Sequence, residues 1–88
     1  MSACPVCGYL TLRGDPFDVC RVCFWEDDGG RDPAARSAAN RMTLAEARAN
    51  FAAFGACDRR VLHLVRPPRP EERPTAASAG AGRSPGRA

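Results

Sequence analysis

Four cysteines lie near the start of this chain in two C-x-x-C pairs, and this feature constrains the fold more than any other. The pairs are Cys4 with Cys7 and Cys20 with Cys23, within "CPVCGYLTLRGDPFDVCRVCFW". Cysteines separated by two residues can direct both sulfurs to one point, and two such pairs supply a tetrahedral thiolate site. A chain of 88 residues has a small core, which a bound metal would stabilise. The pattern predicts a structural metal site.

Other uses of paired cysteines fit the sequence less well. The count of five cysteines suits a disulfide framework poorly, and Cys4 lies too close to the start for a signal peptide to precede it. We therefore expect a cytoplasmic protein with reduced thiols. A redox-active pair would need a thioredoxin-like βαβ setting, and a catalytic zinc would need an open coordination position. Zinc is the expected metal, and a rubredoxin-like iron site is the alternative.

The residues between the two cysteine pairs have the composition of a hairpin. The segment "RGDP" contains Gly14, Asp15 and Pro16, which favour a turn. We expect "YLTL" and "FDVC" on either side of it to pair as two short strands. Gly8 follows the first cysteine pair, where it would let the backbone tighten behind the sulfur.

A helix is predicted over "TLAEARANFAAFG". Thr43 and Glu46 have the spacing of a capping box, and Gly55 stands where a helix of this length would end. Apolar residues recur with helical spacing, and we expect this face to pack on the metal hairpin. The face consists of Leu44, Ala47, Phe51 and Phe54, with Trp25, Tyr9 and Phe17 expected opposite it.

A second short helix is expected after Asp58, a candidate N-cap, and before Pro67. Cys57 lies between the two helices. We expect it to be a buried small apolar residue, with a surface thiol and a spare metal ligand as alternatives. His63 is expected to be packed, because nothing in the sequence places it beside Cys57 for nucleophilic chemistry.

Between the cysteine pairs and the first helix lie an aromatic pair, an acidic run and a polar loop. Phe24 and Trp25 are expected to cover the metal site, with an exposed aromatic patch for a partner as the alternative. The acids at 26–28 indicate a solvated loop, because no calcium-binding spacing follows them. Residues 29–42 show no apolar periodicity and are expected to form a loop.

Charge and composition divide the chain at Arg66. Residues 1–65 carry eight arginines and eight acidic residues, whereas the remainder carries five arginines and two glutamates. From Arg66 on there is no aromatic residue and no aliphatic residue larger than alanine, so we expect disorder there. A near-neutral folded part argues against nucleic-acid binding, which requires a basic face.

Several separate segments resemble the bacterial cysteine-rich CPCC domain family. They are "CPVCGYLTL", "FDVCRVCFWEDDG", "TLAEARANFAAFGACD" and "VRPP", in that order, and the resemblance runs from about Cys4 to Glu72. The family's C-P-C-C motif has a cysteine where this chain has Val6, which cannot ligate a metal. The resemblance implies a zinc-binding module without an assigned enzyme activity.

The sequence therefore predicts a small α+β domain stapled by metal. We expect a zinc-knuckle hairpin and one or two short helices over residues 1–65, with family resemblance to about residue 72 and a disordered tail over 73–88. The expected ligands are Cys4, Cys7, Cys20 and Cys23, and the expected role is protein–protein interaction or regulation rather than catalysis. A nucleic-acid-binding zinc ribbon and an iron electron carrier are the alternative functions.

Overall fold

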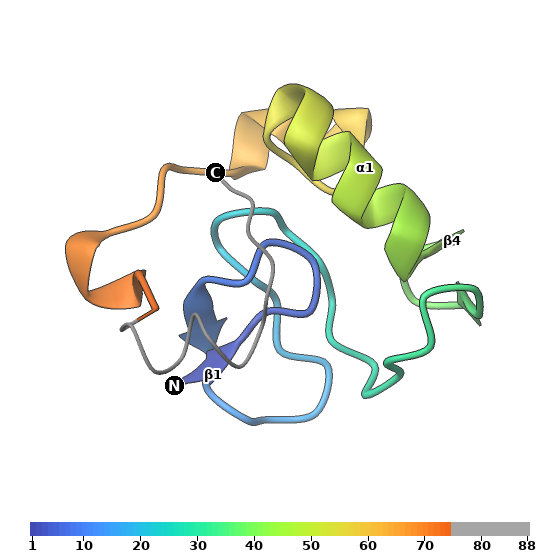
Figure 1. The fold of residues 1–88 in the computed structure, drawn as a ribbon, viewed down its shortest axis with the longest axis horizontal. Helices are drawn as coiled ribbons and strands as arrows, with labels where there is room; N and C mark the ends of the chain where they lie inside the picture. The colour runs from blue at the N-terminus through green and yellow to red at the C-terminus, as the bar shows by residue number, and fades with distance from the viewer. Residues whose placement is uncertain (75–88) are drawn as a thin grey trace.

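The computed structural model describes residues 1–74, in which one α-helix lies over a pair of cysteine-bearing hairpins (Figure 1). The expected fold class, a small α+β domain with one main helix and clustered cysteines, is confirmed. In chain order the elements are β1 (Ser2–Ala3), β2 (Leu10–Leu12), β3 (Arg36–Ser37), β4 (Met42–Thr43), α1 (Leu44–Phe54) and the 3-10 helices η1 (Arg59–Leu64) and η2 (Pro70–Glu72).

Each cysteine pair lies at the tip of its own small hairpin. Strand β1 pairs antiparallel with β2, so Ala3 faces Leu10 across the first pair. Val19 faces Glu26 across the second pair in the same way. The expected pairing of "YLTL" with "FDVC" is therefore wrong. The turn inside each C-x-x-C segment reverses the chain by itself, so the residues flanking a pair become each other's strand partners.

Helix α1 begins and ends where the sequence predicts. The Thr43 side chain accepts a hydrogen bond from the Glu46 amide, and the Glu46 carboxylate accepts one from the Thr43 amide, at 3.0 and 2.8 Å. Gly55 ends the helix in the left-handed conformation with φ of 88°. This conformation carries little penalty for a residue without a Cβ. The capping box therefore fixes the start of α1, and Gly55 fixes its end.

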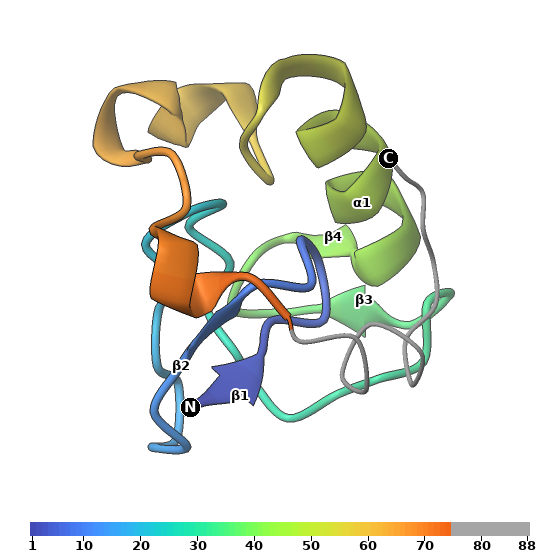
Figure 2. The ribbon, with the colours of Figure 1, turned by 60° about the vertical axis from the view of Figure 1, so that its left-hand side comes forward.

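The loop expected over residues 29–42 contains a further two-stranded hairpin, the β3–β4 hairpin, in addition to the two cysteine hairpins (Figure 2). Strand β3 pairs with β4, placing Ser37 opposite Met42. Asn40, in the turn, exchanges two hydrogen bonds with the main chain of Glu26, donating at 2.8 Å and accepting at 2.9 Å. The Asn40 side-chain amide thus satisfies the main-chain groups of Glu26, as a neighbouring strand would. Two-residue strands are too short to produce an apolar period, so no periodic pattern predicts them.

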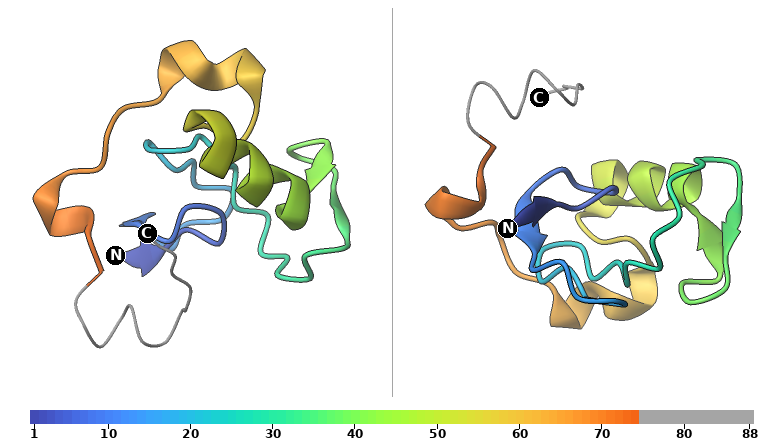
Figure 3. Two further views of the ribbon diagram at one scale, coloured as in Figure 1. Left: turned by 45° about the horizontal axis from the view of Figure 1, so that its top comes forward. Right: turned by 90° about the horizontal axis from the view of Figure 1, so that it is seen from below.

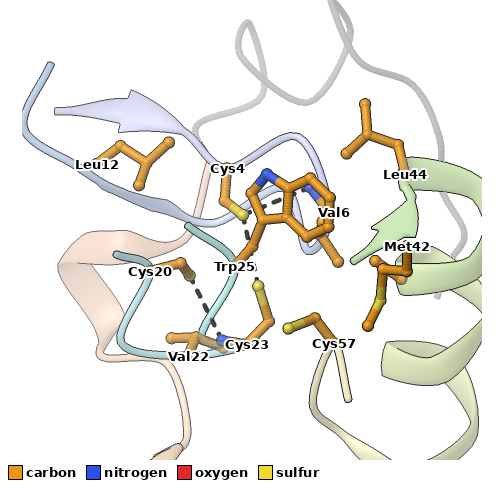
Figure 4. Close-up of a cluster of buried hydrophobic side chains, with 11 residues drawn as sticks. Cys4, Val6, Leu12, Cys20, Val22, Cys23, Trp25, Met42, Leu44 and Cys57 are labelled. Carbon is orange, nitrogen blue, oxygen red and sulfur yellow. Dashed lines mark hydrogen bonds between the residues drawn. The ribbon is translucent and has the colours of Figure 1, made fainter. Parts of the chain in front are cut away.

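The core joins the cysteine hairpins to α1 and β4. Trp25 is fully buried, which confirms that it belongs to the core rather than to an exposed patch (Figure 4). Tyr9 meets Phe51 edge to face with ring centroids 6.5 Å apart. Phe17, expected in the same contact, is instead 57 % exposed. The buried apolar residues are Cys4, Val6, Leu12, Cys20, Val22, Cys23, Trp25, Met42, Leu44, Ala47, Ala56 and Cys57.

The expected second helix forms as the 3-10 helix η1, which lies beside the end of α1 (Figure 3). Asp58 caps it as predicted, by accepting a hydrogen bond from the Arg60 amide at 3.0 Å. Its apolar residues are not buried, however, and Leu62 and Leu64 are 39 % and 48 % exposed. None of the helices in residues 1–74 is long and apolar enough to cross a membrane.

Residues 66–72, which we call the strap, fold back onto the second cysteine hairpin. The Arg66 amide donates to the carbonyl oxygen of Arg21 at 3.2 Å, and its guanidinium forms a two-pronged ion pair with Glu72. The expectation of disorder from Arg66 on is wrong for this segment. An ion pair orders it where apolar side chains are lacking. Residues 75–88 of the expected tail lie outside the described part.

Candidate metal centre

The two cysteine pairs adopt the same backbone turn, repeated sixteen residues later. In the first, the Gly8 amide donates to the Cys4 carbonyl oxygen at 2.9 Å; in the second, the Phe24 amide donates to the Cys20 carbonyl oxygen at 2.7 Å. The residue that closes each turn has a positive φ, 83° for Gly8 and 70° for Phe24. Phe24 has a Cβ in a conformation that costs roughly 1–2 kcal/mol. We call these turns the first knuckle (residues 4–8) and the second knuckle (residues 20–24).

The knuckles bring all four predicted ligand atoms together. The sulfurs of Cys4, Cys7, Cys20 and Cys23 lie within 4.8 Å of one another. The Cys4 and Cys23 sulfurs are 3.5 Å apart, and those of Cys7 and Cys20 are 3.6 Å apart. Four sulfurs at about 2.3 Å from a tetrahedral zinc would be about 3.8 Å from one another. The donor set and its spacing therefore fit a tetrahedral metal ion.

Within residues 1–74, main-chain amides and one hydroxyl donate hydrogen bonds to two of the four sulfurs. The Val6 amide donates to Cys4 Sγ and the Cys23 amide donates to Cys20 Sγ, each at 3.4 Å. Cys20 Sγ also accepts a hydrogen bond from the hydroxyl of Thr11 at 2.9 Å. Sequence reasoning missed Thr11. Its signal was a single hydroxyl residue between the two leucines of "YLTL", next to a predicted thiolate site.

The four thiols affect one another's ionisation. Hydrogen bonds from Cys23 and then Cys4 hold the pKa of Cys20 below its ordinary value. The hydrogen bond with Cys20 raises the pKa of Cys7 and of Cys23. Like charges in so small a volume oppose one another, so ionisation of Cys20 disfavours ionisation of its neighbours. A divalent cation would allow the other thiols to ionise, which is the behaviour of a metal-binding cluster.

Cys57 is buried but is not part of this cluster. It is 3 % exposed, and its main-chain amide donates to the Cys23 carbonyl oxygen at 2.9 Å. Burial, followed by the charge of Asp58, raises the pKa of the Cys57 thiol to about 12. His63 is exposed on η1, and no hydrogen bond joins its side chain to Cys57 within residues 1–74. The expectation of a packed histidine is wrong, and Cys57 has the environment of an apolar core residue.

Comparison with known protein families gave a match for this chain. The family model described as "Cysteine-rich CPCC" matches residues 2–72. The chain belongs to the cysteine-rich CPCC family. The match includes the strap as well as both knuckles and α1. Comparison with curated proteins and with solved structures gave no match.

One position of the CPCC motif itself differs in this chain. Val6 occupies the place of the cysteine that gives the family its name, as the sequence resemblance indicated. The side chain of Val6 is buried beside Trp25, and its amide donates to Cys4 Sγ (Figure 4). The main chain of Val6 forms part of the knuckle turn, and its apolar side chain packs in the core. A thiol at this position is therefore not needed to complete the cluster of four sulfurs.

Proposed function

We propose that this chain is a structural zinc module of the cytoplasm, not an enzyme, in which Cys4, Cys7, Cys20 and Cys23 hold one Zn²⁺. The approach of these four sulfurs to within 4.8 Å of one another carries the proposal. Zinc suits the site because it takes four thiolates in tetrahedral geometry and has no redox chemistry. Four thiolates leave no coordination position for a substrate. The five free cysteines suit a reducing compartment.

We further propose that the zinc-bound domain binds another protein. The sequence suggested an aromatic and acidic surface around Trp25 to Asp28, but burial removes Trp25 from it. Phe17 supplies the exposed aromatic instead. It lines a shallow hollow of about 270 Å³ whose other members are Gly14, Asp15, Pro16, Asp27, Asp28 and Gly29. An exposed ring among carboxylates suits a partner segment that carries basic side chains.

The surroundings of the hollow favour the ionised form of two of its acids, Asp27 and Asp28. The Arg31 side chain lowers the pKa of Asp27, and the Ser37 hydroxyl lowers the pKa of Asp28. The Ser37 hydroxyl donates a hydrogen bond to the Asp28 carboxylate at 2.6 Å, so the β3–β4 hairpin helps to fix the rim of the hollow. A fixed negative rim supports the choice of a basic partner over a nucleic acid, whose phosphates it would repel.

Metal analysis and metal-dependent folding test the zinc proposal. We expect one zinc per chain. Chelation, or the Cys20→Ser substitution, should abolish helical circular dichroism and amide dispersion, because zinc binding contributes about 10–16 kcal/mol in zinc-finger peptides. Adding zinc back to the chelated wild type should restore both signals.

Two outcomes would contradict it. A chain that keeps its fold after complete removal of metal would show that the cysteines are not a metal staple. A coloured, redox-active preparation would identify iron, and the electron-carrier alternative would then be the better account.

A further inference from the structure

The two cysteine hairpins, residues 2–12 and 18–27, meet through few polar contacts. Within residues 1–74, the hydrogen bonds between them are the sulfur pairs Cys4–Cys23 and Cys7–Cys20 and the bond from Thr11 to Cys20. Sulfurs that coordinate a cation as thiolates have lost the protons that the sulfur–sulfur bonds require. The Thr11 hydroxyl keeps its proton. Of these three hydrogen bonds, a site that holds a metal therefore retains the bond from Thr11 to Cys20.

The geometry of this bond suits a charged acceptor. Thr11 is 6 % exposed and Cys20 is fully buried, so water does not compete for either group. The oxygen–sulfur distance of 2.9 Å is shorter than the 3.4 Å of the two amide–sulfur bonds. A buried hydroxyl needs a partner, and a bond to an ionised acceptor is about twice as strong as a neutral one.

The first knuckle has no counterpart to Thr11. The residue sixteen positions later is Asp27, whose carboxylate accepts a hydrogen bond from Arg31 at 2.8 Å and has no proton to donate when ionised. The backbone turns of the two knuckles match, but only Cys20 receives a side-chain donor from the opposite hairpin. The asymmetry lies in side-chain chemistry rather than in the fold.

We propose that Thr11 is a positioning residue of the metal site. Its hydroxyl fixes Cys20 Sγ in the orientation for coordination and withdraws electron density from the thiolate. The inference rests on the proposed zinc function and goes beyond it, because it states which residue sets the strength of metal binding. Outer hydrogen-bond partners of metal ligands commonly affect metal affinity in this way.

The test compares Thr11→Val, which removes the hydroxyl at nearly constant shape, with Thr11→Ser, which keeps it. Zinc affinity is measured by competition with a chelator of known affinity. We expect Thr11→Val to bind zinc about 10–100-fold more weakly than the wild type and Thr11→Ser to bind close to it. With Co²⁺ as the probe, the sulfur-to-metal charge-transfer band of Thr11→Val should move to lower energy. A purely steric role would not move that band.

Equal zinc affinities and equal cobalt spectra for Thr11→Val and the wild type would overturn the inference while leaving the zinc proposal intact. If the wild type itself binds neither metal, the zinc proposal fails, and the inference fails with it. Should Thr11→Val not fold with excess zinc, Thr11→Ser and Thr11→Ala provide the same comparison, because they differ by one oxygen. Equal affinity within that pair would be equally decisive against Thr11.

Discussion

Cys20 and Cys57 are both buried cysteines, but their sulfurs have different surroundings. Cys20 Sγ accepts hydrogen bonds from Thr11 and from the Cys23 amide, and its pKa is lowered. Within residues 1–74, Cys57 forms hydrogen bonds through its main chain alone, and its carbonyl oxygen accepts one from Asn50 at 2.8 Å. Its pKa is raised, to about 12, chiefly by burial. At neutral pH the Cys57 thiol is therefore protonated and acts through packing.

Replacement of Cys57 by alanine tests this distinction. We expect Cys57→Ala to retain one zinc per chain, as measured by metal analysis, and to lose about 1 kcal/mol in free energy of unfolding. The matched control is Cys7→Ala, which removes a proposed ligand and should lose the metal. If Cys57→Ala lost zinc to the same extent as the control, the ligand set would be wrong.

Among the elements, the strap is ordered by charge. Arg66 and Glu72 form two hydrogen bonds at 2.8 and 2.7 Å, and Glu72 also accepts a hydrogen bond from the Arg69 amide at 2.8 Å. Arg66, and then the Arg69 amide, lower the pKa of Glu72 from 4.5 to about 2. Helix η2 contacts β2, the strand that carries Thr11. The ion pair thus joins the two ends of the strap, and η2 lies beside the strand that carries Thr11.

The Glu72→Gln substitution should loosen the strap. We expect the melting temperature of the zinc-loaded protein to fall by roughly 4–8 °C at pH 7, because the ion pair is lost. Since folding lowers the pKa of this carboxyl, its stabilisation is present in full above about pH 4.5 and declines as the pH falls towards 2. The melting-temperature difference between wild type and variant should therefore shrink over that range.

Acid also releases metal from thiolates, but it does so in both proteins, so the difference between them isolates Glu72. Arg60, whose exposed ion pair with Asp58 lies outside the strap, provides the control. Arg60→Gln should change the melting temperature less. A difference between wild type and Glu72→Gln that does not depend on pH would contradict the assigned role of the carboxylate.

For the whole molecule, acidic and basic charge lie in different parts of the chain. The acidic hollow lies on the domain, whereas the excess of arginine lies from Arg66 on. Apart from Pro85, residues 75–88 contain no apolar side chain larger than alanine and so have little to add to a core. If the hollow is the binding surface, residues 1–74 provide both the folding stability and the contacts with the partner.

Deletion of residues 75–88 tests this division. We expect an unchanged melting temperature and undiminished capture of partner proteins from a host lysate by the immobilised, zinc-loaded chain. Phe17→Ser should weaken that capture, whereas Leu64→Ser, a control at another exposed apolar residue, should not. A truncated chain that stays folded but loses its partner, or binds it with a much flatter salt dependence, would assign binding to the arginines of the tail.

The features that the sequence alone determined are those set by interactions between residues close together in the chain. The C-x-x-C spacing indicated the four clustered sulfurs, and Thr43, Glu46 and Gly55 marked both ends of α1. These signals act between residues at most a few positions apart, so they can be read without knowledge of the fold. The family resemblance came from the same short motifs.

Contacts between distant residues were decided only by the tertiary structure. The exposure of Phe17 and the bond from Thr11 to Cys20 each depend on how the two hairpins meet. The strap depends on a single ion pair in a segment whose composition suggests disorder. In so small a core, a few long-range polar contacts fix the arrangement, and no periodic pattern in the sequence announces them.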